Sequence, residues 1–171
     1  HMIGAEVDAW RPRDIIKMLA KASSHQGNLL LNIGPPADGS VLPAYRQSLQ
    51  TVGRWLDRHG EATYGALDAF GGFPSYCGFV SRKANVVYFW RIIWAGTEQG
   101  LGGYETPLRK VTCLTTGRPV DFEQADYRIM LHNLPEQCPD ELAGVAVYKL
   151  EFDDEPVFKW LPTTPAVVAN W

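Results

Sequence analysis

The stretch GNLLLNIGPPADG, residues 27–39, constrains the fold of this chain more than any other. Its apolar run from Leu29 to Ile33 is interrupted only by Asn32 and shows no polar–apolar alternation, a pattern typical of a strand buried on both faces. Strands of this kind occur in parallel sheets and need a neighbouring strand on each edge. We therefore expect the segment to lie inside an α/β layer.

A helix is predicted on either side of this strand. The first, RPRDIIKMLAKASSHQG, has Pro12 in its first turn and Gly27 as its stop. The second, SVLPAYRQSLQTVGRWLDRHG, has Ser40 as its cap, Pro43 in its first turn and Gly60 at its end. One-sided apolar stripes are formed by Ile15, Ile16, Leu19 and Ala22 in the first helix, and by Tyr45, Leu49, Val52 and Leu56 in the second.

From residue 73 onward the pattern changes to short strands bounded by turns. GFVSRKANVVYFWRIIW predicts two strands around an Ala-Asn turn, and LRKVTCLTTG, RPVDFEQADYRIMLHNLP and AGVAVYKLEFDDEP predict further ones. Such spacing is typical of an antiparallel β-sandwich. The predicted fold class is therefore α+β: a helix-strand-helix unit over 1–64, a linker over 65–74 and a sandwich over 75–171, whose Pro-rich tail packs on a surface.

The two parts differ in whether they can close a core. One buried strand with two helices leaves both strand edges open, which is costly in unpaired backbone groups. We therefore expect residues 1–64 to be the last piece of a larger α/β domain, the remnant of which can self-associate through its strand edges.

Charge and cysteine content exclude several classes of protein. The net charge is −3 and the 16 Lys and Arg residues are scattered, so nucleic acid is not an expected partner. No apolar run approaches the length of a membrane span, and no signal peptide is visible. The three cysteines, Cys77, Cys113 and Cys138, lack CxxC spacing, which argues against a zinc site. We expect three buried free thiols, with one disulfide as the alternative.

The run GNLLLNIGPPADGSVLPAYRQSLQTVGRWLDRHGEATYG resembles the end of the catalytic barrel in α-L-fucosidases of glycoside hydrolase family 29. That family has a GN-LLLNIGP strand, a DG turn and a helix ending in WL…NGEAIYG; here His59 replaces the usual Asn and Thr63 the common Ile. CGFVSRKANVVYFWRIIW resembles its GYFTRKGD-LY strand pair, and RPVDFEQADYRIMLHNLPEQCPDELAGVAVYKLEFD its later sandwich strands, including the LP…PD turn. The similarity runs from about Asp14 to Phe152.

The resemblance implies a parent enzyme with a (β/α) barrel and a C-terminal β-sandwich that removes terminal α-L-fucose with retention. Such chemistry needs two carboxyl groups roughly 5–5.5 Å apart. No position here matches the family's catalytic motifs, so no catalytic, cofactor-binding or metal-binding residue is assigned, and no cofactor is expected. The chain alone is expected to be inactive, with fucosylated glycans as partners of the parent enzyme, whose family is often secreted, periplasmic or lysosomal. The alternative is an independent carbohydrate-binding sandwich module.

Two residues of the stretch 27–39 could lie near the active site of the parent enzyme, because barrel active sites lie at the C-terminal ends of strands. Asp38 is the only acidic residue in the loop that follows the strand, but Asp-Gly favours a tight turn instead. Asn32 could support a catalytic loop, although a buried amide that satisfies backbone groups is favoured.

Several histidines and aromatic residues are further candidates for a functional role. His25 and His59 each sit beside a helix-ending Gly, which favours interaction with the helix end over catalysis. His132 falls on the outer face of a strand without a carboxylate nearby in sequence, and Glu6 with Asp8 is a poor catalytic pair. No pocket role is assigned to Trp10. Tyr88, Trp90 and Trp94, predicted on one strand face, could stack on sugars, but a core role is favoured.

Overall fold

The computed structural model describes residues 9–65, 67 and 76–158. The predicted linker 65–74 lies largely outside the described residues, as do Glu6, Asp8 and the tail beyond residue 158. The elements, in chain order, are α1 (Pro12–Ser24), α2 (Pro43–His59), the 3-10 helix η1 (Gly60–Ala62), β1 (Gly78–Lys83), β2 (Val86–Arg91), β3 (Gln99–Gly102), β4 (Leu108–Cys113), β5 (Arg118–Pro119), β6 (Phe122–Ala125), β7 (Arg128–Leu131) and β8 (Ala146–Phe152).

Both predicted helices form, and each begins with proline, whose missing N–H costs nothing in the first turn. The predicted cap is wrong: Leu42 occupies the N-cap position of α2, and Ser40 instead donates its backbone N–H to Asp38. The buried faces are rotated from the predicted stripes. They comprise Ile15, Ile16, Ala20 and Ser23 in α1, and Val52, Trp55 and His59 in α2.

The strands form two antiparallel sheets, as predicted. One has the order β1-β2-β8-β4-β5 and the other β3-β7-β6. The Ala-Asn turn between β1 and β2 places Ala84 at φ 47°, and the register pairs Lys83 with Val86. β3 is not predicted from the sequence, because its Gln-Gly-Leu-Gly sequence lacks the β-branched and aromatic residues that favour strands.

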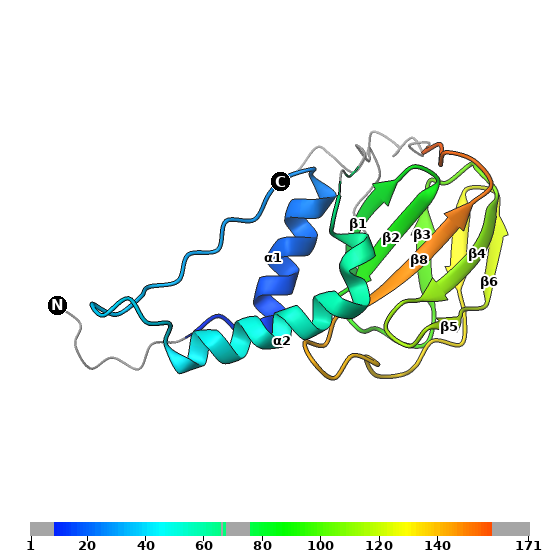
Figure 1. Cartoon of the computed structure of the whole chain (residues 1–171). Coiled ribbons are helices and arrows are strands. Elements are labelled where there is room, and N and C mark those ends of the chain that lie inside the picture. The colour runs from blue at the N-terminus through cyan, green and yellow to red at the C-terminus, as the bar shows by residue number, and fades with distance from the viewer. Residues whose placement is uncertain (1–8, 66, 68–75, 159–171) are drawn as a thin grey trace, which may run out of the picture.

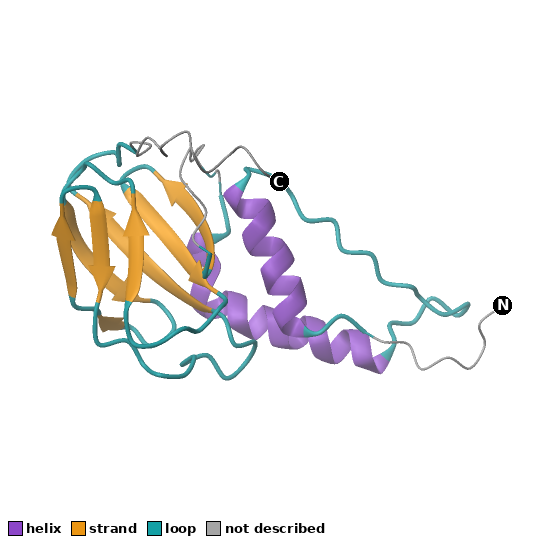
Figure 2. Ribbon diagram, turned by 180° about the vertical axis from the view of Figure 1, so that it is seen from behind, coloured by secondary structure: helices purple, strands orange, loops and turns teal. Residues whose placement is uncertain are grey.

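Two apolar cores lie on opposite faces of the five-stranded sheet. The first lies between the sheets and includes Phe89, Leu131 and Leu150. The second lies between the outer face of the large sheet and the helices, and includes Ile16, Trp55 and Trp90. Figure 1 shows α1 and α2 beside β1, β2 and β8, and Figure 2 shows the helices on one side of the strands from behind. The helices therefore share a core with the sheet.

The predicted inner strand is the main departure from expectation. Residues 27–36 are extended but are assigned to no strand, and Figure 1 shows the segment between α1 and α2 running away from the sheets. Leu30 is 86% exposed, while Leu29, Leu31 and Ile33 are half-buried. Burial on both faces is therefore wrong for the described residues, because no described strand lies alongside to cover this segment.

Candidate functional site

The junction between α2 and the large sheet is held by two buried side chains. Trp55 is fully buried and donates its indole N–H to the carbonyl of Val145 at 3.0 Å. His59 is also fully buried and stacks on Trp55, with ring centroids 4.1 Å apart. Its Nδ1 donates to the Trp55 carbonyl at 2.8 Å, and its Nε2 accepts from the Thr115 hydroxyl at 2.9 Å. The Trp55 carbonyl and the Thr115 hydroxyl therefore give both ring nitrogens a hydrogen-bond partner.

Glu61 in η1 extends the junction along the sheet. Its carboxylate accepts from Lys149 Nζ at 2.8 Å and from the Tyr88 hydroxyl at 3.4 Å. Lys83 donates to the backbone carbonyls of Glu61 and Tyr64. Burial, followed by the Glu61 charge, raises the pKa of Tyr88 to about 12. These contacts hold the GEATYG phrase against β1, β2 and β8.

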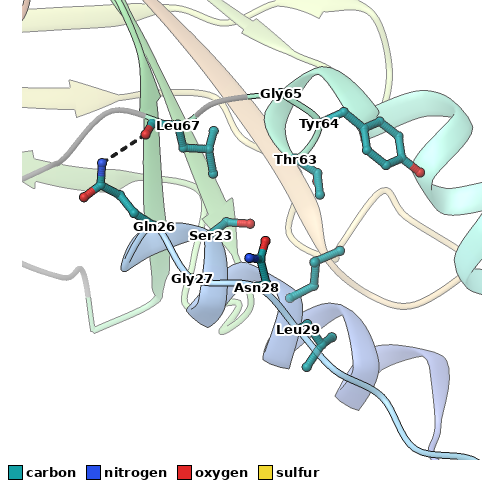
Figure 3. Close-up of a pocket in the computed structure, with 10 residues that line it drawn as sticks. Ser23, Gln26, Gly27, Asn28, Leu29, Thr63, Tyr64, Gly65 and Leu67 are labelled. Carbon is teal, nitrogen blue, oxygen red and sulfur yellow. Dashed lines mark hydrogen bonds between the residues drawn. The ribbon is translucent and has the colours of Figure 1, made fainter.

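A cavity of about 590 Å³ opens between the end of α1, the start of the extended segment and the residues after η1 (Figure 3). Gln26 spans one side and donates from Nε2 to the Leu67 carbonyl at 3.0 Å. The Thr63 hydroxyl is buried there without a hydrogen-bond partner. The described lining comprises Leu19, Ser23, Gln26, Gly27, Asn28, Leu29, Thr63, Tyr64, Gly65 and Leu67.

This lining is suited to packing and hydrogen bonding rather than to hydrolysis. Its described residues include neither a carboxylate nor a histidine, whereas retaining glycosidases need two carboxyl groups. Nowhere in the described ranges do three or more His, Cys, Asp or Glu side chains gather in a way that could hold a metal ion. Within the same ranges, neither helix has the length and apolar character needed to cross a bilayer.

In residues 27–39, Asp38 stabilises a turn and does not act as a catalytic acid. The Asp38 side chain accepts from the backbone N–H of Ser40 at 2.9 Å, and the backbone and side-chain hydrogen bonds from Ser40 lower its pKa. The turn prediction for Asp38 is therefore confirmed. The prediction for Asn32 is wrong: this amide is exposed, because its segment has no strand beside it.

The histidines behave mainly as structural groups. His25 Nδ1 lies 2.9 Å from the Lys21 carbonyl, so the predicted interaction with the end of α1 is confirmed. His59 is bound to the Trp55 carbonyl, one turn back in α2, but also reaches Thr115 across the junction. His132 does have a carboxylate neighbour: its Nδ1 lies 3.1 Å from Oε1 of Glu98. This pair could not be predicted from the sequence, because 34 residues separate the two side chains.

The aromatic residues do not form an open platform. Tyr88 and Trp90 are buried beneath the helices, whereas Trp94 packs against the core between the sheets. The common face predicted for all three is wrong for Trp94, because β2 ends at Arg91. Trp10 is 49% exposed. The three cysteines form no disulfide with one another, but the predicted burial holds only for Cys113, since Cys77 and Cys138 are half-buried.

The buried imidazole makes stability depend on pH. Burial lowers the pKa of His59 below its ordinary value of 6.5, so the unfolded chain binds more protons than the folded chain in this range. The stability that comes from the neutral ring is complete above pH 6.5 and is lost as the pH falls towards the folded pKa. We expect the wild type to lose more thermal stability than His59→Asn between pH 8 and pH 5, measured by circular dichroism. Equal losses in the two proteins would contradict this role.

Comparison with known proteins places this arrangement in a family. The family described as Alpha-L-fucosidase matches residues 5–61. Tissue alpha-L-fucosidase of Mus musculus is 43% identical over 138 residues, which are 77% of this chain and 30% of that protein. An α-L-fucosidase GH29 of Bacteroides thetaiotaomicron, solved as a trapped covalent intermediate with 2-fluoro-fucosyl fluoride, is 27% identical with a TM-score of 0.72, covering 82% of this chain and 32% of that one.

A further solved structure agrees in fold. Alpha-L-fucosidase isoenzyme 1 from Paenibacillus thiaminolyticus has a TM-score of 0.78 at 24% identity, covering 88% of this chain and 37% of that one. The chain spans well under half the length of each of these relatives. The resemblance noted in the sequence is confirmed: this chain belongs to the α-L-fucosidase family of glycoside hydrolases and corresponds to part of such a protein.

Proposed function

We propose that this chain is the C-terminal portion of a retaining α-L-fucosidase-like hydrolase that removes terminal α-L-fucose. In this proposal, residues 1–64 are the last helix-strand-helix unit of the (β/α) barrel, 65–74 a linker and 75–171 an accessory β-sandwich. The sandwich is a structural support: it shares the core around Trp55 and Trp90 with the helices and so holds the end of the barrel.

The observation that carries the proposal is the extended segment over 27–36. It has the composition of an inner strand, yet Leu30 is 86% exposed and no described strand pairs with the segment. A buried-strand sequence with both edges open is incomplete by itself. Neighbouring barrel strands would satisfy both edges and would also fill the cavity beside Asn28 and Leu29.

The test is an activity assay on the chain as it stands. We expect no release of nitrophenol from p-nitrophenyl α-L-fucoside above the buffer rate, because none of its carboxylates matches a catalytic motif of the family. Turnover that disappears when an acidic residue of this chain is replaced by its amide would contradict the proposal.

Fucosylated glycans are then substrates of the whole enzyme rather than ligands of this chain. The rival proposal is an independent carbohydrate-binding module. Tyr88 and Trp90 are the aromatic side chains best suited to stack on a sugar, but they lie under the helices and are not open to a ligand. The open edges around Leu30 also make self-association of the isolated chain part of the proposal.

A further inference from the structure

Arg91 is a buried charge that has no counter-ion among the described residues. Its side chain is at the end of β2, is fully excluded from solvent, and stacks on Trp94 with the guanidinium carbon 4.1 Å from the ring centroid. Nη2 donates to the Gly96 carbonyl at 2.9 Å, but Nε and Nη1 have no hydrogen-bond partner. The ion pairs of the described residues do not include Arg91. Buried guanidinium groups are normally paired, because an unpaired charge in a protein interior is strongly unfavourable.

Tyr148 supplies a second buried donor beside this guanidinium. Its side chain is fully buried between the sheets, and its hydroxyl also has no hydrogen-bond partner. In the β2–β8 register Arg91 pairs with Ala146 and Phe89 with Tyr148, so Arg91 and Tyr148 are diagonal neighbours on one sheet face.

The protonation states make this cluster donor-rich. Burial, followed by the nearby Cys113 thiol, raises the pKa of Tyr148, whereas the charge and the side-chain contact of Arg91 lower it in part. Burial also raises the pKa of Cys138, which packs against the same core. The Tyr148 hydroxyl and the Cys138 thiol therefore keep their protons near neutral pH, and each remains a donor.

A cavity of about 190 Å³ borders the cluster on the side of Tyr148. Tyr148, Cys113 and Pro135 line it, and Pro135 also accepts the indole N–H of Trp94 at 2.9 Å. Since one water takes about 30 Å³ of liquid volume, the cavity has room for a small ion with waters. Its other described lining residues are Thr116, Arg118, Pro119, Val120, Asp121, His132, Asn133 and Leu134.

The charged residues that line this cavity are compatible with the entry of an anion. Arg118 is exposed and adds a cation. Asp121 is the one carboxylate among the described lining residues, and its Oδ2 accepts from Asn133 Nδ2 at 3.0 Å.

We propose that the unpartnered buried donors of Arg91 and Tyr148 form a binding site for a small monovalent inorganic anion such as chloride or bromide. The anion accepts from Nε and Nη1 of Arg91 and from the Tyr148 hydroxyl, and neutralises the buried guanidinium. The site stabilises the two-sheet unit, is separate from any fucose chemistry, and does not depend on the proposed function.

The first test measures thermal unfolding while bromide replaces gluconate at constant ionic strength and pH. Because a ligand that binds only the folded chain stabilises it, we expect the midpoint to rise by about 3–5 °C once bromide reaches roughly ten times its dissociation constant. Tyr148→Phe keeps the ring and removes the hydroxyl, so at least half of this rise should be lost. Arg91→Met should abolish it.

The matched control is Arg109→Met, which makes the same charge change at an exposed position of β4 and should keep the full bromide response. If Arg91→Met does not fold, crystals of the wild type in bromide provide the second measurement. An anomalous peak within hydrogen-bonding distance of Arg91 and Tyr148 supports the site. Only water at this position, or an equal bromide response in wild type and Tyr148→Phe, overturns it.

Discussion

Trp55→Ala is expected to lower the free energy of unfolding by about 3–5 kcal/mol, as is typical when a large buried aromatic residue is removed. Trp55 is fully buried, and its ring contacts those of His59 and Trp90, with centroids 4.1 Å and 5.4 Å away. The substitution leaves a void at the junction of α2 with the sheet and an unpaired carbonyl at Val145. Urea denaturation followed by circular dichroism would measure the change.

Two further variants separate packing from hydrogen bonding at this position. Trp55→Phe retains much of the ring but not the indole N–H, and should cost about 1–3 kcal/mol. Leu30→Ala serves as the control because Leu30 is 86% exposed, and its effect should stay within about 0.5 kcal/mol. If Trp55→Ala costs no more than Leu30→Ala, the helices do not share a core with the sheet.

Asp140→Ala should lower the free energy of unfolding by about 2–4 kcal/mol, because it removes a buried charged acceptor and leaves donors unpaired. Asp140 is only 4% exposed and belongs to the turn before β8. Its carboxylate accepts the backbone N–H groups of Ala143 at 2.9 Å, Val145 at 3.2 Å and Leu142 at 3.4 Å. Loss of these bonds should loosen the turn that presents the Val145 carbonyl to Trp55. Thermal and urea unfolding would measure the loss.

Asp140→Asn is the more conservative change, because the amide keeps one acceptor oxygen, and it should cost less than Asp140→Ala. Asp154→Ala is the matched control: it removes an exposed carboxylate after β8 and should be close to neutral. If Asp140→Ala and Asp154→Ala are equally mild, the turn is not held by the carboxylate.

Elements with strong periodicity were predictable from sequence. Apolar patterns and turn residues indicate the correct positions of both helices, of the hairpin around Ala84 and of strands β4 and β8. β3 was not predictable, because its two glycines carry no pattern and its pairing with β7 comes from distant residues. The buried face of α2 also differs from the predicted stripe, because Trp55 and His59 contact groups near residues 145 and 115.

The candidate sites show the same division between local and distant information. The turn at Asp38 depends on a hydrogen bond two residues away, so it could be predicted. The pairing of His132 with Glu98 and the burial of Arg91 beside Tyr148 depend on strand register, which joins residues 34 and 57 positions apart. A strand such as β2 carries apolar side chains on both faces, so its composition does not indicate which face a helix covers.

The two helices, most strands and the resemblance to α-L-fucosidases can be recognised in the sequence, because each depends on local patterns or on contiguous motifs. Three features follow only from tertiary contacts: the core that the helices share with the large sheet, the enclosure of Arg91 between the sheets, and the lack of a described strand beside residues 27–36. Burial and pairing are properties of two surfaces in contact, and a local sequence pattern describes only one of them.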